Sequence, residues 1–257
     1  MILNRLKICY LTIYNMISSK RVDKKKYNYN NIDFGFYDEI FHKNKGVRSA
    51  WHYTKFYNIK KKINKKDTHL DIGCGSGTFV SLLSNKMSYG IDISSKQIKY
   101  ANMKYGGENK IFHSYKKKIP YSNNTFDSIS LIELLEHLSD KEIYILFKEI
   151  FRVLKPDGVI HVTTPNYLSF WPLLELILNK VSKVSYEHQH INKFNRFNIN
   201  KITNKLKIKI VEKNTFMLIG PFLAFFSFKI STLWIIVDNF LTKIFPGFLI
   251  YVKIIKK

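Results

Sequence analysis

The sequence contains only two cysteines, Cys9 and Cys74, among its 257 residues. Two cysteines cannot build the disulfide framework of a small secreted domain, and they fit a reducing, cytoplasmic compartment. No internal repeat is evident. The hydrophobic content of 46% argues against disorder, and the length suffices for one large domain with a substantial core.

Acidic residues are scarce: 19 Asp and Glu stand against 42 Lys and Arg, which gives a formal net charge of +23. Such an excess indicates a polyanionic neighbour, either nucleic acid or an anionic membrane surface. A coding bias toward lysine and asparagine would explain it equally well. No RNA-recognition or zinc-finger pattern accompanies the lysine runs, which argues against nucleic acid as a partner.

The sequence has no clean apolar run of the ~20 residues that a membrane-spanning helix needs. Residues 1–20 carry Arg5 and Lys7 inside an apolar run without a small-residue cleavage site, which favours an amphipathic helix over a secretory signal. Residues 216–240 predict an apolar helix that contains Pro221 and Lys229. This helix would be buried, lie in a membrane interface or, at the cost of burying Lys229 in lipid, span the bilayer.

From residue 68 onward, short apolar runs alternate with amphipathic helical patterns, as is typical of a βαβ sheet. Two helices are predicted to begin with capping boxes, Ser94 with Gln97 and Ser139 with Glu142. The second is predicted to end at the turn 155–158. The predicted strands are residues 69–72, 87–92, 126–132, 159–164, 207–214 and part of 247–257.

The segment HLDIGCGSGTFV places Gly73, Gly75 and Gly77 between a strand and a helix. Glycines permit the tight turn and let a ligand approach the backbone, while the helix start offers free amides. The spacing is G-x-G-x-G rather than G-x-G-x-x-G, and no Gly-Lys-Ser/Thr follows, which excludes a P-loop. Asp92 ends the next strand, where a carboxylate can bind both ribose hydroxyls. Together with Asp71, these residues predict a site for a ribose-containing cofactor.

These motifs resemble those of the class I S-adenosylmethionine-dependent methyltransferases. DIGCGSG is similar to their first motif and GIDIS to their second, and FKEIFRVLKPDGVIHVTTPN resembles the late helix-turn-strand of the ubiquinone- and menaquinone-biosynthesis branch. The resemblance covers about residues 65–166. It implies an α/β, Rossmann-like fold with a seven-stranded, mostly parallel sheet, helices on both faces and an antiparallel last strand.

The resemblance also divides the chain. Residues 1–65 would form a helical lead-in that caps the cofactor, and residues 66–257 would form the methyltransferase domain. Within this domain, residues 66–166 would be the cofactor-binding core and residues 167–257 the acceptor side.

S-adenosyl-L-methionine is the cofactor that the resemblance implies. Asp71 and the three glycines would line its methionine end, Asp92 would hold the ribose, and Ile93 would pack near the adenine. Family members usually carry an aspartate for the adenine amino group, where this chain has HSYKKK, with Ser114 or Tyr115 at the matching place. We therefore expect adenine recognition to be altered, through Ser114 or the backbone.

The segment IELLEH (132–137) follows the predicted strand 126–132. If a helix begins there, Glu133, Glu136 and His137 share one face at the carboxyl end of the sheet, where ligands bind. The segment resembles the E-x-x-E-H motif of ubiquinone-biosynthesis O-methyltransferases and of small-RNA 3′-terminal 2′-O-methyltransferases. In both families this motif is associated with a divalent cation beside the acceptor hydroxyl.

That likeness makes Glu133, Glu136 and His137 the candidate catalytic residues and, with His190, the candidate metal ligands. The segment YEHQHINKF also offers Glu187 and His188. Oxygen ligands suit Mg²⁺, whereas a histidine shifts the preference toward Mn²⁺ or Zn²⁺. A metal-free role, with His137 as base or orienting group, and a purely structural role remain open.

The apolar segments 170–184 and 216–240 lie in the acceptor-side half and have lysines beside them. They suggest peripheral membrane contact, at the inner face of the membrane, or alternatively a dimer interface or buried core. The expected reaction is O-methylation of a small, lipid-linked or quinone-like hydroxyl acceptor. The alternatives are an RNA acceptor, or a cofactor-binding, membrane-associated protein without turnover.

Overall fold

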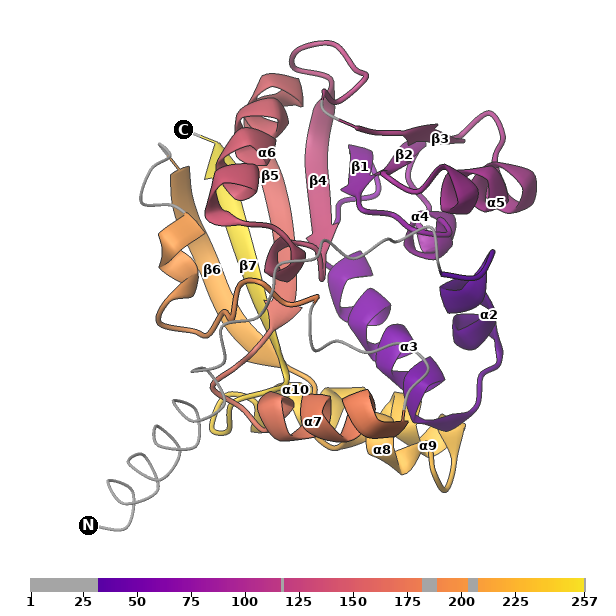
Figure 1. Cartoon of the computed structure of the whole chain (residues 1–257), viewed down its shortest axis with the longest axis vertical. Coiled ribbons are helices and arrows are strands. Elements are labelled where there is room, and N and C mark those ends of the chain that lie inside the picture. Colours follow the sequence, from indigo (N-terminus) through magenta and orange to yellow (C-terminus); the bar gives the residue numbers. More distant parts are fainter. Residues whose placement is uncertain (1–31, 117, 182–188, 203–207, 257) are drawn as a thin grey trace.

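The computed structural model describes residues 32–116, 118–181, 189–202 and 208–256. Figure 1 shows one central sheet with helices packed around it. The amphipathic helix predicted for residues 1–20, and the candidate ligands Glu187 and His188, lie outside the described residues.

Seven strands form this sheet in the order β3-β2-β1-β4-β5-β7-β6 (Figure 1). β7 runs antiparallel to its neighbours β5 and β6, and the other neighbouring pairs are parallel. The predicted Rossmann-like fold class, with an antiparallel last strand, is therefore confirmed. The strands are β1 (Thr68–Ile72), β2 (Met87–Asp92), β3 (Lys110–Ser114), β4 (Phe126–Ile132), β5 (Leu154–Pro165), β6 (Ile208–Phe216) and β7 (Leu249–Lys256).

The strand order reverses beside β1. The chain runs outward from β1 to β2 and β3, and then returns to place β4 on the other side of β1. In open sheets of this kind, ligands bind at the carboxyl ends of the strands where the order reverses. The segments that follow β1, β2 and β4 should therefore form the site.

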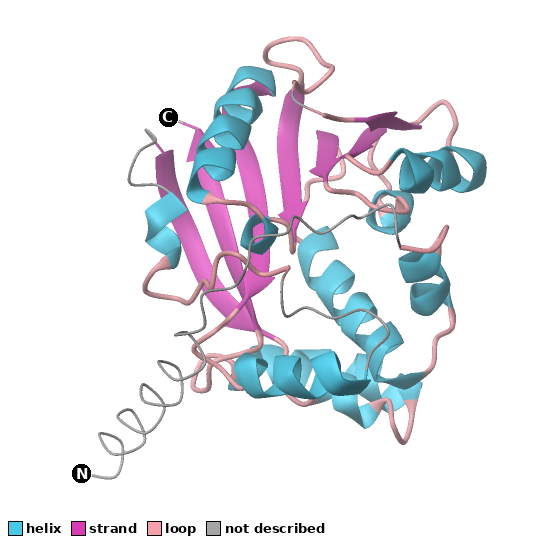
Figure 2. Cartoon of the chain, in the orientation of Figure 1, coloured by secondary structure: helices cyan, strands magenta, loops and turns pink. Residues whose placement is uncertain are grey.

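Helices cover both faces of the sheet (Figure 2). Leu249 packs in a buried cluster with Phe79 of α4, whereas its neighbour Ile250 packs in another with Phe147 of α6. Because successive strand side chains point to opposite faces, the two clusters lie on opposite sides of β7. The helices are α2 (Phe36–His42), α3 (Gly46–Lys60), α4 (Thr78–Leu82), α5 (Ser95–Tyr105), α6 (Asp140–Val153), α7 (Trp171–Val181), α8 (Gly220–Leu223), α9 (Phe228–Leu233), α10 (Ile235–Leu241) and the 3-10 turns η2 (Leu135–His137) and η3 (Ile199–Ile202).

One of the two predicted capping boxes is complete. The Ser139 hydroxyl accepts from the Glu142 amide, and the Glu142 carboxylate accepts from the Ser139 amide. At α5 only half of the box forms: Ser94 Oγ accepts from the Gln97 amide. The Gln97 side chain instead donates to the carbonyl of Asp33 at 2.9 Å, and so it joins α5 to the segment before α2.

The turn predicted at residues 155–158 is part of β5. Phe126 pairs with Leu154 and Ser128 pairs with Val159, so the intervening residues bulge out of the strand. Asp157 occupies the left-handed region with φ 60°, which allows the bulge to close. β3, for which no range was predicted, follows the loop after α5 at the sheet edge.

The single apolar helix predicted for residues 216–240 is wrong. β6 continues to Phe216, and the rest folds into α8, α9 and α10. Pro221 lies in the first turn of α8, and Ser227 caps α9 by accepting from the Ile230 amide, so helix starts interrupt the run. Within the described ranges, every helix is too short or too polar to cross a membrane.

Candidate active site

The glycine loop leads from β1 into α4. Gly73, Gly75 and Gly77 all have positive φ, at 78°, 52° and 77°, a backbone conformation that residues other than glycine rarely adopt. A Cβ on Gly77 would lie 2.8 Å from the Phe112 ring and 2.9 Å from Ala101, so this glycine permits close packing. A Cβ on Gly75 would meet nothing within 4 Å, so this position faces open space. Gly75 is therefore the glycine that a ligand can approach.

Asp92 ends β2 beside that loop. Its Oδ2 accepts from the Gly75 amide at 2.9 Å, and its Oδ1 accepts from the Ser94 amide at 2.8 Å. Each carboxylate oxygen can accept a second hydrogen bond, as a ribose diol requires. Burial raises the pKa of Asp92 above its usual range. Ile93, half-exposed, lines the same cavity as Asp92.

Asp71 lies one strand away and is buried. Its Oδ1 accepts from Ser130 Oγ at 2.5 Å, and Ser130 Oγ also lies 2.9 Å from His69 Nε2. Burial raises the pKa of Asp71 to about 7, and the nearby Asp92 adds to the rise. The carboxyl group can therefore gain or lose a proton near neutral pH, within the cavity that it lines.

Ser114, which we predicted to contact the cofactor, is not among the residues that line the cavity. Ser114 is exposed at the end of β3, where it pairs with Asp92 in the sheet register. Tyr115 lies in the cavity wall instead, and its amide donates to the Asp92 carbonyl at 2.8 Å. Successive side chains of an extended chain point to opposite sides, which is why Tyr115 lines the cavity and its neighbour Ser114 does not.

The segment after β4 is not the helix that was expected. Glu133 has φ 52°, and its amide donates to the Thr163 carbonyl at 3.0 Å, which extends the β4–β5 pairing by one residue. A single 3-10 turn, η2, follows. Glu133 therefore does not share a helix face with Glu136 and His137. A non-glycine residue held in the left-handed region is a strained arrangement that clusters at functional sites.

Glu133 forms an ion pair with Lys55 instead of joining Glu136 and His137. Its Oε2 accepts from Lys55 Nζ, which α3 presents to the cavity, and both side chains are largely buried. Lys55 also lies 5.2 Å from the centre of the Phe56 ring. The pattern of the sequence carries no signal for Lys55, because its partner is 78 residues away.

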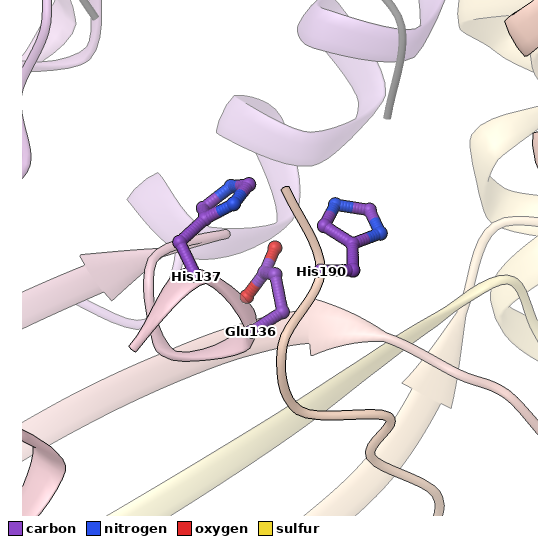
Figure 3. Close-up of side chains that lie close together, drawn as sticks. All are labelled: Glu136, His137 and His190. Carbon is purple, nitrogen blue, oxygen red and sulfur yellow. The ribbon is translucent and has the colours of Figure 1, made fainter. Parts of the chain in front are cut away.

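Glu136, His137 and His190 lie together at the carboxyl ends of β4 and β5 (Figure 3). One ligand atom from each lies within 4.8 Å of the others. In Figure 3 the Glu136 carboxylate points between the two imidazole rings. The structure thus brings together three of the four predicted metal ligands, and Glu133 lies apart from this cluster.

Backbone and side-chain hydrogen bonds hold the cluster in place. The Glu136 carbonyl accepts from the amides of Ile191 and Asn192, which fixes the segment that carries His190. Glu136 Oε2 accepts from Thr164 Oγ1 at 3.0 Å, whereas its buried Oε1 has no partner among the described residues. Burying a carboxylate oxygen without a hydrogen-bond partner costs free energy, so a ligand bound in the cavity is the expected partner of this oxygen.

Burial and neighbouring charges change the protonation of these groups. Burial raises the pKa of Glu136 to about 7 and lowers the pKa of His137 to about 3, with His190 adding to the second shift. Burial opposes the charged form of His190, but the hydrogen bond to Glu175 and the charge of Glu136 outweigh it and raise the pKa of His190. His190 Nδ1 lies 2.9 Å from both Glu175 Oε1 and the Tyr167 hydroxyl.

One cavity of about 1370 Å³ joins these parts. Its wall includes Asp71, Gly75 and Asp92 as well as the Glu136–His137–His190 cluster. Aromatic residues also line it, among them Trp51 of α3 and Trp171 of α7, whose ring centres lie 5.5 Å apart. The volume exceeds the ~300–1,000 Å³ of ordinary ligand pockets, so two ligands can share it.

A family model described as a methyltransferase domain matches residues 70–162, a range that contains the glycine loop, Asp92 and η2. An uncharacterized protein of Methanocaldococcus jannaschii is 31% identical over 202 residues, which are 74% of this chain and 78% of that protein. The demethylmenaquinone methyltransferase of Lactobacillus johnsonii is 28% identical over 127 residues, 46% of this chain and 50% of that enzyme. The chain belongs to the class I S-adenosylmethionine-dependent methyltransferases.

Solved structures agree with this methyltransferase fold. Magnesium protoporphyrin IX methyltransferase from Synechocystis, with bound SAH, superposes with a TM-score of 0.60 at 14% identity, covering 89% of this chain and 96% of that one. A SAM-dependent methyltransferase from Aquifex aeolicus gives a TM-score of 0.56 at 16% identity, covering 88% and 99%. The chain spans only 59% and 64% of the length of two other curated relatives, from Bacillus subtilis and Methanocaldococcus jannaschii.

Proposed function

We propose that this methyltransferase transfers the methyl group of S-adenosyl-L-methionine to a hydroxyl group of a small, lipid-linked or quinone-like acceptor. The observation that carries the proposal is the shared cavity, which connects the Asp71–Asp92 side to the Glu136–His137–His190 cluster. Methyl transfer is an in-line displacement, so cofactor and acceptor must meet in one enclosed space in a fixed orientation.

On the cofactor side, each proposed role follows from a local feature. Asp92 offers its remaining acceptor sites to the ribose, and Gly75 leaves room at the backbone. Ile93 and Tyr115 present apolar surface on which an adenine can pack. Asp71, with a pKa of about 7, can carry a negative charge toward the cationic methionine end.

On the acceptor side, Glu136 is the better candidate for the base. A base works most effectively when its pKa lies near the working pH, and the pKa of Glu136 is about 7 whereas that of His137 is about 3. His137 Nδ1 lies 3.0 Å from the Gln189 carbonyl, which orients the ring and assigns its lone pair to Nε2. His137 would therefore position the acceptor rather than take its proton.

A divalent cation is the second way in which this cluster could act. The donor set fits one: Glu136 has an oxygen without a partner among the described residues, and the Nδ1 atoms of His137 and His190 face the Gln189 carbonyl and Glu175. Histidine ligands of metals are commonly oriented by such outer contacts. A bound cation, Mg²⁺ or a metal that accepts nitrogen ligands, would lower the pKa of an acceptor hydroxyl.

The acceptor class rests on the apolar part of the wall. Trp51, Trp171, Leu174, Leu178 and Phe222 line the cavity beside the cluster, which suits an acceptor with an apolar body. Named relatives act on acceptors of different chemistry, such as demethylmenaquinone and, in Plasmodium falciparum, phosphoethanolamine. The relatives therefore support methyl transfer more strongly than they support any one acceptor.

The test measures transfer of a labelled methyl group to hydroxyl-bearing acceptors, among them hydroquinones and lipid-linked phenols, with and without a chelator. We expect Glu136→Gln to lower kcat by about 10²-fold or more, while cofactor affinity stays unchanged. Met103→Ser, which changes an exposed side chain of α5, is the control and should behave like the wild type. Loss of turnover with chelator, restored by a divalent cation, would favour the metal. Cofactor binding without transfer to any hydroxyl would contradict the proposal.

A further inference from the structure

The helices α8, α9 and α10 expose an apolar surface, here called the apolar end. Phe225 and Phe226 are adjacent on the loop between α8 and α9 and are 84% and 87% exposed. Monomeric proteins seldom expose such a concentration of large apolar side chains without a use for it. The exposed apolar residues of this surface include Phe225, Phe226, Ile230, Leu233, Ile236, Val237, Phe240, Ile244 and Phe245.

The apolar end is firmly attached to the body of the protein. Asp238 of α10 is buried, and its carboxylate accepts from the amides of Leu218 at 2.8 Å and Gly220 at 2.9 Å. Ala224 and Ile235 are buried on the inner side of the same helices. The outward side chains are therefore presented by a fixed support rather than by a loose segment.

The charges of this segment are of one sign at the surface. Residues 217–248 contain three charged residues, Lys229, Asp238 and Lys243, and Asp238 is buried. Both lysines are exposed beside the apolar residues, in a chain with a formal net charge of +23. Apolar side chains flanked by lysine are the pattern of segments that lie in the interface of an anionic membrane.

The apolar end also borders the cavity. Trp171 of α7 and Phe222 of α8 both line the cavity wall. A series of ring contacts connects these two residues through Trp51 and Phe248. The distances between ring centres are 5.5 Å for Trp171–Trp51, 5.7 Å for Trp51–Phe248 and 5.8 Å for Phe248–Phe222. Figure 1 shows α7, α8 and α9 at the same end of the molecule.

We propose that the apolar end docks on an anionic lipid membrane, with Phe225 and Phe226 inserted at the boundary between headgroups and acyl chains. A second copy of the chain is the less favourable occupant, because a symmetric contact would bring Lys229 and Lys243 toward their own like charges. The inference goes beyond the proposed methyl transfer and does not require it.

Vesicle flotation of the full chain, without cofactor, tests this docking. Vesicles of phosphatidylcholine alone are compared with vesicles in which part of the lipid is phosphatidylglycerol. The wild type should float with the anionic vesicles and much less with the neutral ones. F225S/F226S should lower the binding constant tenfold or more. K229E/K243E should lower it on anionic vesicles by at least about fivefold per lysine.

Met103→Ser is the matched control, because Met103 is 71% exposed but lies on α5, away from this end of the molecule (Figure 1). This variant should float like the wild type. All variants should bind S-adenosylmethionine with wild-type affinity in calorimetry without vesicles, which shows that they fold. This arm also separates a failure of docking from a failure of the proposed function.

Two outcomes would overturn the proposal. In the first, F225S/F226S floats like the wild type, which would place any membrane contact elsewhere in the chain. In the second, the wild type is a dimer by light scattering and the same variant is a monomer with unchanged flotation, which would assign the surface to a second copy.

Discussion

At the scale of single residues, the site is built from buried ionisable groups whose neighbours set their charge. Asp71 and Glu136 both have a pKa of about 7, because burial disfavours their carboxylate forms. Asp71 receives a hydrogen bond from Ser130, and Glu136 receives one from Thr164. Both groups line one cavity, Asp71 near the glycine loop and Glu136 beside His137 and His190.

Asp71→Asn should change how stability depends on pH. The pKa of Asp71 rises from 3.8 to about 7 on folding, so the folded state holds its proton more tightly than the unfolded state. Below about pH 4 both states are protonated; as pH rises from there to about 7, ionisation makes folding less favourable. We expect the unfolding free energy of Asp71→Asn, relative to that of the wild type, to increase by on the order of 1–3 kcal/mol as the pH is raised from 4 to 8.

Denaturant unfolding of both proteins without cofactor, at pH 4.5 and pH 8, measures this difference. Asp38→Asn is the comparison, because hydrogen bonds from Lys104 and two tyrosines offset burial and lower the pKa of Asp38. Loss of a carboxylate with a lowered pKa should destabilise the protein at pH 8. Equal pH profiles for wild type and Asp71→Asn would contradict the assignment.

Lys55 and Glu133 should depend on each other for stability. Lys55→Met would leave the largely buried Glu133 carboxylate without its cation, and we expect a loss of about 2 kcal/mol. Lys55→Met/Glu133→Gln removes both charges and should recover part of the loss. A double-mutant cycle by urea unfolding gives the coupling free energy, and a value near zero would show that the pair contributes nothing.

At the scale of elements, the turns after β1 and β4 decide what the cavity can hold. Both turns contain residues with positive φ, Gly73, Gly75 and Gly77 in the first and Glu133 in the second. The first turn supplies an approach to the backbone, and the second aims Glu133 at α3 while η2 carries Glu136 and His137 toward His190. Short connections at the strand ends, rather than long helices, therefore place the polar groups.

Gly77→Ala should mainly lower stability, whereas Gly75→Ala should mainly lower cofactor affinity. An alanine at 77 would bring its Cβ within 2.8 Å of Phe112, so we expect a stability loss of about 2 kcal/mol or more. The Cβ of an alanine at 75 would meet nothing within 4 Å, so only the positive φ should cost stability, about 1 kcal/mol. The same Cβ would occupy the open space beside the backbone, so we expect cofactor affinity to fall. Thermal unfolding and calorimetry of both variants separate the two effects, and identical behaviour would refute the distinction.

At the scale of the whole molecule, the cavity connects parts of the chain that are distant in sequence. α3 supplies Trp51 and Lys55, the sheet supplies Asp71 and Asp92, and α7 supplies Trp171. A ligand bound there would contact α3, the sheet and α7 at the same time. Cofactor binding should therefore stabilise the molecule as a unit.

Saturating S-adenosylmethionine should raise the unfolding free energy by about 2.7 kcal/mol at a concentration 100 times its Kd. The stabilisation should appear as one cooperative thermal transition at higher temperature. Asp92→Ala removes the carboxylate that accepts from the Gly75 amide, and we expect its stabilisation by the same cofactor concentration to fall by at least half. An unchanged shift in this variant, measured by scanning calorimetry, would contradict the role of Asp92.

The sequence by itself determined the local features. The glycine spacing, Asp71, Asp92 and the Ser139–Glu142 cap are encoded within a few residues, and alternating apolar runs indicated the parallel sheet. Only the tertiary structure decided the rest. Tyr115 rather than Ser114 lines the cavity, and Glu133 pairs with Lys55, 78 residues away, instead of joining Glu136, His137 and His190. Pro221 and Ser227 mark helix starts within residues 216–240, but the arrangement of the short helices depends on buried Asp238, which binds amides 18 to 20 residues earlier. Contacts over such separations depend on the path of the chain, which no local pattern specifies.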